Sequence, residues 1–226
     1  MKILLKNATI LDPSSPFHST SQDLLIQNGE IAKISNDIID TDNTKVIEHD
    51  NLHVSKGWFD SGVSFGEPGY EERETLENGL YVAASSGFTK ILLNPDIIPI
   101  PDSNSTISHL FKMGQNKTTS LYPIGALTDK GEGKQLASLY DMHRQGAIGF
   151  GDYKSSLTSG NLLKIALQYV QSFDGIIFSY PLNDEIAESG VMHEGIISTR
   201  IGVKGIPSLA ETIQIARDLQ ILSYTE

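Results

Sequence analysis

Apolar residues in the first part of the chain form short runs that are separated by turn-forming residues. The clearest turn signal is Asn28-Gly29, a dipeptide that favours a tight hairpin turn between antiparallel strands. An acidic, turn-rich stretch follows at 36–44. The composition changes near residue 52, where we expect a domain boundary. The pattern predicts a meander of small β-strands at 2–6, 23–27, 30–35 and 46–48.

After residue 52, strand patterns alternate with helical ones. Five apolar or β-branched runs start about 30 residues apart, and the segments between them repeat their apolar positions with a helical period. This alternation is typical of parallel strands that are covered by helices, so it predicts an α/β fold, either an open sheet or a (β/α)₈ barrel. The predicted strands are 57–65, 88–94, 121–127, 146–151 and 175–180, and the predicted helices are 71–86, 103–115, 133–144, 160–172 and 208–222.

Charge and composition narrow the classes of partner. The 226 residues include 17 Lys and Arg against 28 Asp and Glu, which gives a net charge of −11. Such a surface repels nucleic acids and anionic membranes, and we expect it to bind neither. The absence of cysteine excludes disulfides and thiolate chemistry. No apolar run reaches the roughly 18 residues of a membrane span, so we expect a cytoplasmic protein.

The segment 56–69, KGWFDSGVSFGEPG, resembles the first barrel strand of dihydroorotases and related cyclic amidohydrolases of the amidohydrolase superfamily. That strand usually reads P-G-(F/L)-I-D-x-H-V-H-x-R-E-P-G. Asp60 and the run from Glu67 to Gly69 match this motif. The segment at 79–89 is similar to the family's G-x-x-A-A-x-x-G-G-(F/V)-T, and the stretch at 191–207 resembles the segment after the fifth strand. The resemblance extends over essentially the whole chain.

The chemical positions of the family motif are occupied by different residues. Gly62 and Ser64 stand where the family has two metal-binding histidines, and Gly66 stands where it has a substrate-binding arginine. Ser179 stands at the ligand histidine of the fifth strand. Neither glycine nor serine replaces a neutral imidazole as a zinc ligand, and Gly66 offers no guanidinium.

Three other residues are candidates for a site. The resemblance places Asn94 one position away from a substrate-contacting asparagine, and it places Asp152 at the metal-bridging aspartate of the fourth strand. Asp60, on the first strand, is a weaker candidate for a metal ligand, and we expect it to hydrogen-bond nearby backbone. None of the six histidines has H-x-H spacing, and His193, beside Glu194, is interpreted as a residue that binds no metal.

The resemblance implies a composite fold. Residues 1–52 would form a small N-terminal β-strand domain, part of a composite β-sandwich, and residues 53–226 the first part of a TIM barrel. A (β/α)₈ barrel needs eight units, and the chain supplies about five. We therefore expect that the C-terminal part of the barrel is missing from this chain.

The resemblance also implies a function. Active relatives interconvert carbamoyl-aspartate and dihydroorotate in pyrimidine biosynthesis, with zinc as cofactor. Because Gly62, Ser64, Ser179 and Gly66 replace the family's ligands, we expect this chain to be catalytically inactive and to need no cofactor.

Two alternatives remain open. One is an active cyclic-amide hydrolase with a relocated, carboxylate-rich metal site formed by Asp60, Asp152 and His193. The other is a non-catalytic scaffold, either in a homo-oligomer or as a partner of an aspartate transcarbamoylase, a role for which the family has inactive members.

Overall fold

The chain folds into two compact units, which meet in sequence between Gly57 and Trp58. The computed structural model describes residues 2–39 and 43–225. The sequence placed the boundary after residue 52, before strand β5 (His53–Ser55). Because β5 pairs in parallel with the end of β1 (Lys2–Leu11), it belongs to the first unit.

The first unit is a five-stranded β-sheet. Its strand order is β3-β2-β1-β4, and β5 also pairs with β1. The predicted hairpin joins β2 (Ser21–Gln27) to β3 (Glu30–Ser35), and the next strand is β4 (Thr44–Glu48). The two residues of the turn between β2 and β3, Asn28 and Gly29, have positive φ angles, 54° and 86°, as a tight type I′ hairpin turn requires.

A partly buried ion pair links strands β1 and β2 of the first unit. The side chain of Asp23 is 1% exposed, and its Oδ2 lies 2.5 Å from the Lys6 ammonium. The amides of Asn7 and Ile38 donate to the same carboxylate at 3.0 and 2.9 Å. Burial acts to raise the pKa of Asp23, but the hydrogen bonds from Lys6 and the two amides outweigh it and lower that pKa below its ordinary value.

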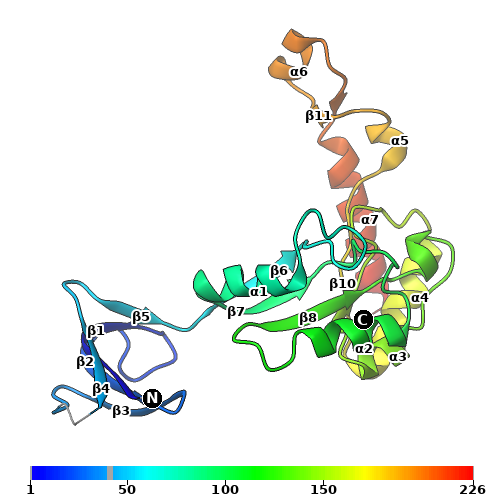
Figure 1. Ribbon diagram of the computed structural model, residues 1–226. Helices are drawn as coiled ribbons and strands as arrows, with labels where there is room; N and C mark the ends of the chain where they lie inside the picture. Colours follow the sequence, from blue (N-terminus) through cyan, green and yellow to red (C-terminus); the bar gives the residue numbers. More distant parts are fainter. Residues whose placement is uncertain (1, 40–42, 226) are drawn as a thin grey trace. The chain divides into compact units, whose positions relative to one another are not determined.

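The second unit contains a curled sheet of five parallel strands, which forms half of a barrel (Figure 1). The strands lie in sequence order, so each strand pairs with the strand before it in the chain. This order is that of a (β/α) barrel, and the predicted partial TIM barrel is confirmed. The strands are β6 (Trp58–Val63), β7 (Phe88–Leu93), β8 (Ser120–Gly125), β9 (Gly149–Phe150) and β10 (Ile176–Ile177).

Helices follow the first four strands and bury their apolar faces. Two clusters of buried side chains form the core, one around Ile91 and Leu110 and the other around Ile107 and Phe150. The first helix begins after Thr75, whose Oγ1 accepts a hydrogen bond from the amide of Asn78 as an N-cap. The helices are α1 (Leu76–Ser85), α2 (Asn104–Met113), α3 (Leu139–Arg144) and α4 (Gly160–Val170).

The helix predicted at 133–144 is much shorter than expected. After a 3₁₀ turn, η1 (Asp129–Gly131), the chain folds back on itself, and the bridge between Thr128 and Leu136 pairs its two sides. The amide of Ala137 donates to the carbonyl oxygen of Leu127. These bonds hold the backbone amides and carbonyls outside a helix, so α3 begins only at Leu139.

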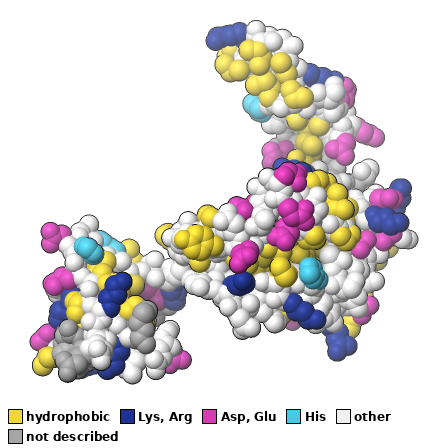
Figure 2. Space-filling view, viewed as in Figure 1, with side chains coloured by type: hydrophobic (Ala, Val, Ile, Leu, Met, Phe, Trp, Pro, Cys, Tyr) yellow, Lys and Arg dark blue, Asp and Glu magenta, His cyan; other side chains and the backbone are white. Residues whose placement is uncertain are grey.

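A second 3₁₀ turn, η2 (Gln171–Phe173), precedes β10, and a small subregion follows that strand. It contains α5 (Asp184–Ala187), α6 (Ile196–Ile201) and the short parallel pair β11 (Met192–His193) and β12 (Gly205–Ile206). The predicted C-terminal helix is present as α7 (Leu209–Thr225), which packs against α4 and α5. Apolar side chains remain exposed along α6 and α7, as Figure 2 shows. Within the described ranges, no helix is both long and apolar enough to cross a membrane.

Candidate functional site

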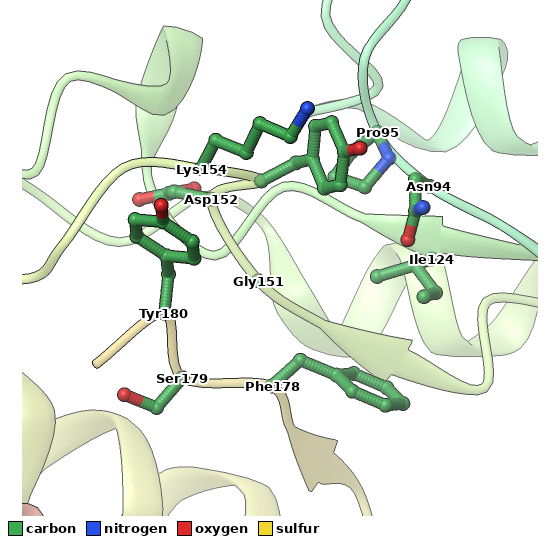
Figure 3. A pocket seen from close by; sticks show the side chains of 10 residues that line it. Asn94, Pro95, Ile124, Gly151, Asp152, Lys154, Phe178, Ser179 and Tyr180 are labelled. Atoms are coloured by element: carbon green, nitrogen blue, oxygen red, sulfur yellow. The ribbon is translucent and has the colours of Figure 1, made fainter. Parts of the chain in front are cut away.

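A small open cavity lies at the carboxyl ends of strands β7 to β10. Its volume is about 100 Å³. This end of the sheet is where parallel α/β barrels place their binding sites, because the loops that follow the strands converge there. In Figure 3 the side chains of Lys154, Asn94, Phe178 and Tyr180 are arranged around the cavity, whereas Ser179 points away from it.

Phe178 forms one wall of the cavity by lying against β9. Its ring occupies the space where Gly149 has no side chain, since an added Cβ there would be 2.5 Å from the Phe178 Cε2 atom. A Cβ on Gly151 would be 2.7 Å from the Phe178 carbonyl oxygen. The amide of Phe178 donates to the carbonyl oxygen of Phe150 at 2.8 Å, which extends the pairing of β10 with β9. Two glycines thus allow the close approach that shapes the cavity.

The side chain of Asn94 occupies the space beside two of the predicted ligand positions. Its Nδ2 atom donates to the Ser64 hydroxyl at 3.1 Å. A Cβ added to Gly62 would lie 3.5 Å from the same amide group. The structure therefore brings Asn94, Gly62 and Ser64 together, and Asn94 also lines the cavity.

Gly66 has a backbone conformation that disfavours any side chain. Its φ angle is 103°, and an added Cβ would lie 2.7 Å from the carbonyl oxygen of Tyr70. An L-residue is strained at such a φ angle, and the clash is with backbone, which has little freedom to move. The position that the resemblance assigns to a substrate-binding arginine is therefore built for glycine in this chain.

Ser179 lines the cavity with its backbone, but its side chain points away and bonds to helix α7. Its hydroxyl donates to the Asp218 carboxylate at 2.6 Å. The same carboxylate accepts two hydrogen bonds from Arg217, whose guanidinium also reaches the carbonyl oxygens of Leu157 and Thr158. This network joins the end of β10 and the loop before α4 to α7.

The carboxylates that match the family motifs all accept hydrogen bonds from backbone amides. The Asp60 Oδ1 atom accepts from the amide of Gly62 at 3.1 Å. The Glu67 Oε2 atom accepts from the amide of Leu76 at 2.5 Å, and so holds the start of α1. Asp60 therefore makes the kind of local backbone contact expected of it.

Asp152 accepts more hydrogen bonds than either of these two carboxylates. Its Oδ1 accepts from the amides of Leu127 and Thr128 at 3.0 and 3.1 Å, and its Oδ2 accepts from the Thr128 hydroxyl at 2.5 Å. With both oxygens occupied, the side chain fixes the loop after β8 to the end of β9.

The donor set at this end of the sheet does not fit zinc. Gly62 has no donor atom, and the hydroxyls of Ser64 and Ser179 are weak ligands that already bond to neighbours. His193, the third member of the suggested relocated site, is exposed on β11 and lines a different cavity with Tyr180 and Glu211. Across residues 2–39 and 43–225, no three His, Asp or Glu side chains gather as a metal site would require.

Sequence reasoning did not select the residues that give the cavity its charge and aromatic character. Tyr153, Lys154 and Tyr180 all line it. The available signal was their place in the chain, because Tyr153 and Lys154 come just after the predicted strand 146–151 and Tyr180 is the last residue of the predicted strand 175–180. Polar residues at such positions face the mouth of a barrel.

The second unit is a partial (β/α) barrel, and the fold of the chain is shared by solved structures. An L-hydantoinase (dihydropyrimidinase) from Arthrobacter aurescens superimposes with a TM-score of 0.77 and 19% identity, over 99% of this chain and 51% of that protein. A D-hydantoinase superimposes with a TM-score of 0.70. At these identities the similarity concerns the fold.

The family is defined by sequence. A family model described as dihydro-orotase-like matches residues 54–224. The dihydroorotase of Syntrophus aciditrophicus is 35% identical over 227 aligned residues, and that of Pelotomaculum thermopropionicum is 34% identical over 225. Each match covers 100% of this chain but only 53% and 52% of the relative, so the chain spans about half the length of these curated relatives. The chain belongs to the dihydroorotase-like family.

Proposed function

We propose that this chain is a non-catalytic dihydroorotase-like protein. The observation that carries the proposal is the state of four positions at the mouth of the half barrel, namely Gly62, Ser64, Gly66 and Ser179. Two of them are glycines and two are serines whose hydroxyls bond to Asn94 and Asp218. Hydrolysis of a cyclic amide needs an activated water and a group that stabilises the developing negative charge, and these four residues supply neither.

The neighbouring carboxylates do not compensate for this loss. A general base must have a free lone pair that faces the reacting atom. Both oxygens of Asp152 already accept hydrogen bonds, from three donors of the loop after β8. Asp60 accepts one hydrogen bond, from the amide of Gly62, and keeps free lone pairs. The argument against a relocated metal site is that, among the described residues, no group of three His, Asp or Glu side chains forms there.

A structural role in pyrimidine biosynthesis fits the family and the retained fold. Under this proposal the chain works as a scaffold, in a homo-oligomer or beside an aspartate transcarbamoylase, in the cytoplasm and without a cofactor. The exposed apolar side chains of α6 and α7, such as Ile196 at 78% and Leu219 at 58%, support a role in assembly. Co-purification of the tagged chain with a transcarbamoylase subunit tests the partner, and a monodisperse monomer that captures none contradicts it.

A chimera tests the catalytic part of the proposal. Residues 1–226 of this chain replace the matching part of the Syntrophus aciditrophicus dihydroorotase, so that the C-terminal part of that relative is present. We expect no hydrolysis of dihydroorotate with added zinc, from the chimera or from the chain alone. The full-length relative is the positive control.

A restored chimera provides the matched comparison. It carries Gly62→His, Ser64→His and Ser179→His, and we expect it to retain more zinc than the unaltered chimera, because three imidazoles are returned to the mouth. Circular dichroism and gel filtration show whether both chimeras are folded. Zinc-dependent turnover by the unaltered chain or by the unaltered chimera would refute the proposal.

A further inference from the structure

Two Asn-Gly dipeptides occur in the chain, at 28–29 and 78–79, in contrasting surroundings. Such a dipeptide can cyclise, because glycine lacks a Cβ and leaves its amide nitrogen open to attack the preceding asparagine side chain. The first dipeptide forms the turn between β2 and β3, and the second lies inside α1. The fold therefore decides which of the two is free to react.

The hairpin turn leaves both reacting groups of the first dipeptide open to solvent. Asn28 and Gly29 are exposed, and a Cβ added to Gly29 would have no neighbour within 4 Å. In the described part of the chain, neither the Asn28 side chain nor the Gly29 amide has a hydrogen-bond partner. Rearrangement of this turn therefore breaks no hydrogen bond of the two groups and displaces no packed side chain.

Helix α1 holds the second dipeptide in place. The amide of Gly79 donates to the carbonyl oxygen of Thr75 at 2.9 Å, and the Asn78 side chain donates to both carboxylate oxygens of Glu74 at 3.1 Å. Gly79 is buried, and an added Cβ would lie 2.6 Å from the Phe65 ring. Cyclisation at Asn78 first requires a turn of α1 to open, whereas an exposed hairpin turn rearranges at little cost.

We propose that Asn28 is a site of spontaneous deamidation. The Gly29 amide nitrogen, after losing its proton to base, attacks the Asn28 Cγ atom, so that the N–Cγ bond forms, the Cγ–Nδ2 bond breaks and ammonia leaves. Solvent water then opens the cyclic imide. Addition of water at Cγ gives aspartate, and addition at the main-chain carbonyl carbon of residue 28 gives isoaspartate, whose backbone runs through Cγ. The reaction needs neither metal nor substrate, so its outcome is independent of the proposed function.

Either product changes the hairpin between β2 and β3. Both add a carboxylate close to Glu30, in a chain whose net charge is already −11. Isoaspartate also lengthens the backbone between Gln27 and Glu30, which are partners in the strand register. Because β3 pairs only with β2 among the described strands, a longer turn loosens this edge pairing and leaves the pairing of β1 with β2 in place.

A variant assigns the isoaspartate to one residue. In Asn28→Gly the reacting side chain is removed, and glycine adopts the positive φ angle of the turn, so the hairpin is kept. After incubation of the full chain at mildly alkaline pH, an isoaspartyl methyltransferase labels any isoaspartate. We expect labelling of the peptide that spans residue 28 in the unaltered chain and none in the variant. Equal labelling of that peptide in the folded variant would contradict the assignment to Asn28.

The two dipeptides provide the decisive comparison within one molecule. Peptide-resolved mass spectrometry follows the mass gain of the amide-to-acid change at each asparagine during the same incubation. In the native chain we expect Asn28 to deamidate at least about tenfold faster than Asn78, because only Asn78 must wait for a helix to open. In urea, where the fold holds neither dipeptide, the two rates should become similar. Equal rates in the native chain, or an Asn28 that stays unmodified, would overturn the proposal.

Discussion

The half barrel has a wall, formed by strands β6 to β10 and the helices that cover them, and a mouth, formed by the residues at the carboxyl ends of these strands. Side chains of the wall pack into the core, whereas side chains of the mouth form local hydrogen bonds. In the wall, Ile91 of β7, Ile107 of α2 and Phe150 of β9 are fully buried and pack into two cores. At the mouth, Gly62, Ser64 and Ser179 are exposed, and the two hydroxyls form local hydrogen bonds. The difference teaches that the fold rests on many buried apolar positions, whereas the mouth consists of a few exposed residues that contribute little to the packing.

The largest effect should come from the wall. Phe150 is 0% exposed and makes an edge contact with Phe173 in the core beside α4. Phe150→Ala should lower the free energy of unfolding by about 3–5 kcal/mol, through lost burial and a residual cavity. Urea denaturation followed by circular dichroism measures it.

The control for Phe150→Ala is Tyr180→Ala at the mouth, which should cost much less because Tyr180 is 39% exposed. Equal losses in the two variants would remove the distinction between wall and mouth.

The next effect should come from Asp152, a carboxylate at the mouth that accepts three hydrogen bonds from the loop after β8. Asp152→Ala leaves the amides of Leu127 and Thr128, both in buried residues, without their acceptor. We expect a loss of about 2–3 kcal/mol, the usual penalty for unsatisfied buried donors. Denaturation in urea is again the measurement.

Asp60→Ala serves as the comparison for Asp152→Ala, since Asp60 accepts one bond from the exposed Gly62. It should cost less than about 1 kcal/mol. If removal of Asp152 proves as mild as removal of Asp60, its assignment as an anchor of the loop after β8 is wrong.

The first unit offers a carboxylate of a different kind, paired with a cation. The pKa of Asp23 is lower in the folded chain than its ordinary value of 3.8. The ionised carboxylate therefore stabilises the first unit fully when the pH is above the ordinary pKa of 3.8. This stabilisation is lost as the pH falls through the lowered pKa of the folded chain. We expect the stability of the first unit to decrease with acid, and Asp23→Asn to flatten that decrease.

Urea titrations at several pH values, followed through the NMR signals of the β1 and β2 amides, measure this dependence. Asp37→Asn is the control, because the Asp37 side chain is 82% exposed and lies 3.4 Å from the same lysine. A pH dependence that Asp23→Asn leaves unchanged would contradict the assignment.

The smallest effect should separate two glycines at the mouth. Gly62 lies in β6 with ordinary contacts, so Gly62→Ala should change the free energy of unfolding by less than about 0.5 kcal/mol. Gly66→Ala should cost about 1 kcal/mol or more, because its φ angle of 103° and the Tyr70 carbonyl oxygen oppose a Cβ. Thermal unfolding of the pair measures the difference, and a neutral Gly66→Ala would show that this turn accepts an L-residue.

Much of the wall could be predicted from the sequence. The apolar runs of β7 and β8 and the helical period of α4 and α7 are local patterns, so their positions were found to within a few residues. The turn at Asn28-Gly29 was equally local. The prediction of a helix over 133–144 was wrong for its first half, because the pairing of Thr128 with Leu136 competes with helix formation there. The spacing of apolar residues in a local segment does not indicate such a pairing.

The mouth was less predictable. The resemblance identified which positions lack ligands, but the side chains that replace those contacts come from distant parts of the chain. Asn94 reaches Ser64 from the next strand, and Asp218 reaches Ser179 from α7. Such contacts follow from the tertiary fold and not from local sequence.

In the first unit, the placement of β5 likewise depends on a long-range pairing, with β1.

The zinc content of the chain tests the central claim most directly. The purified chain is incubated with excess zinc, passed through a desalting column and analysed for bound metal, beside the double variant Gly62→His with Ser64→His. We predict that the unaltered chain retains no stoichiometric zinc and that the double variant retains more, because its imidazoles are returned to one face of β6. Stoichiometric zinc in the unaltered chain, lost on substitution of Asp60 or Asp152, would contradict the account of the mouth as a site without metal chemistry.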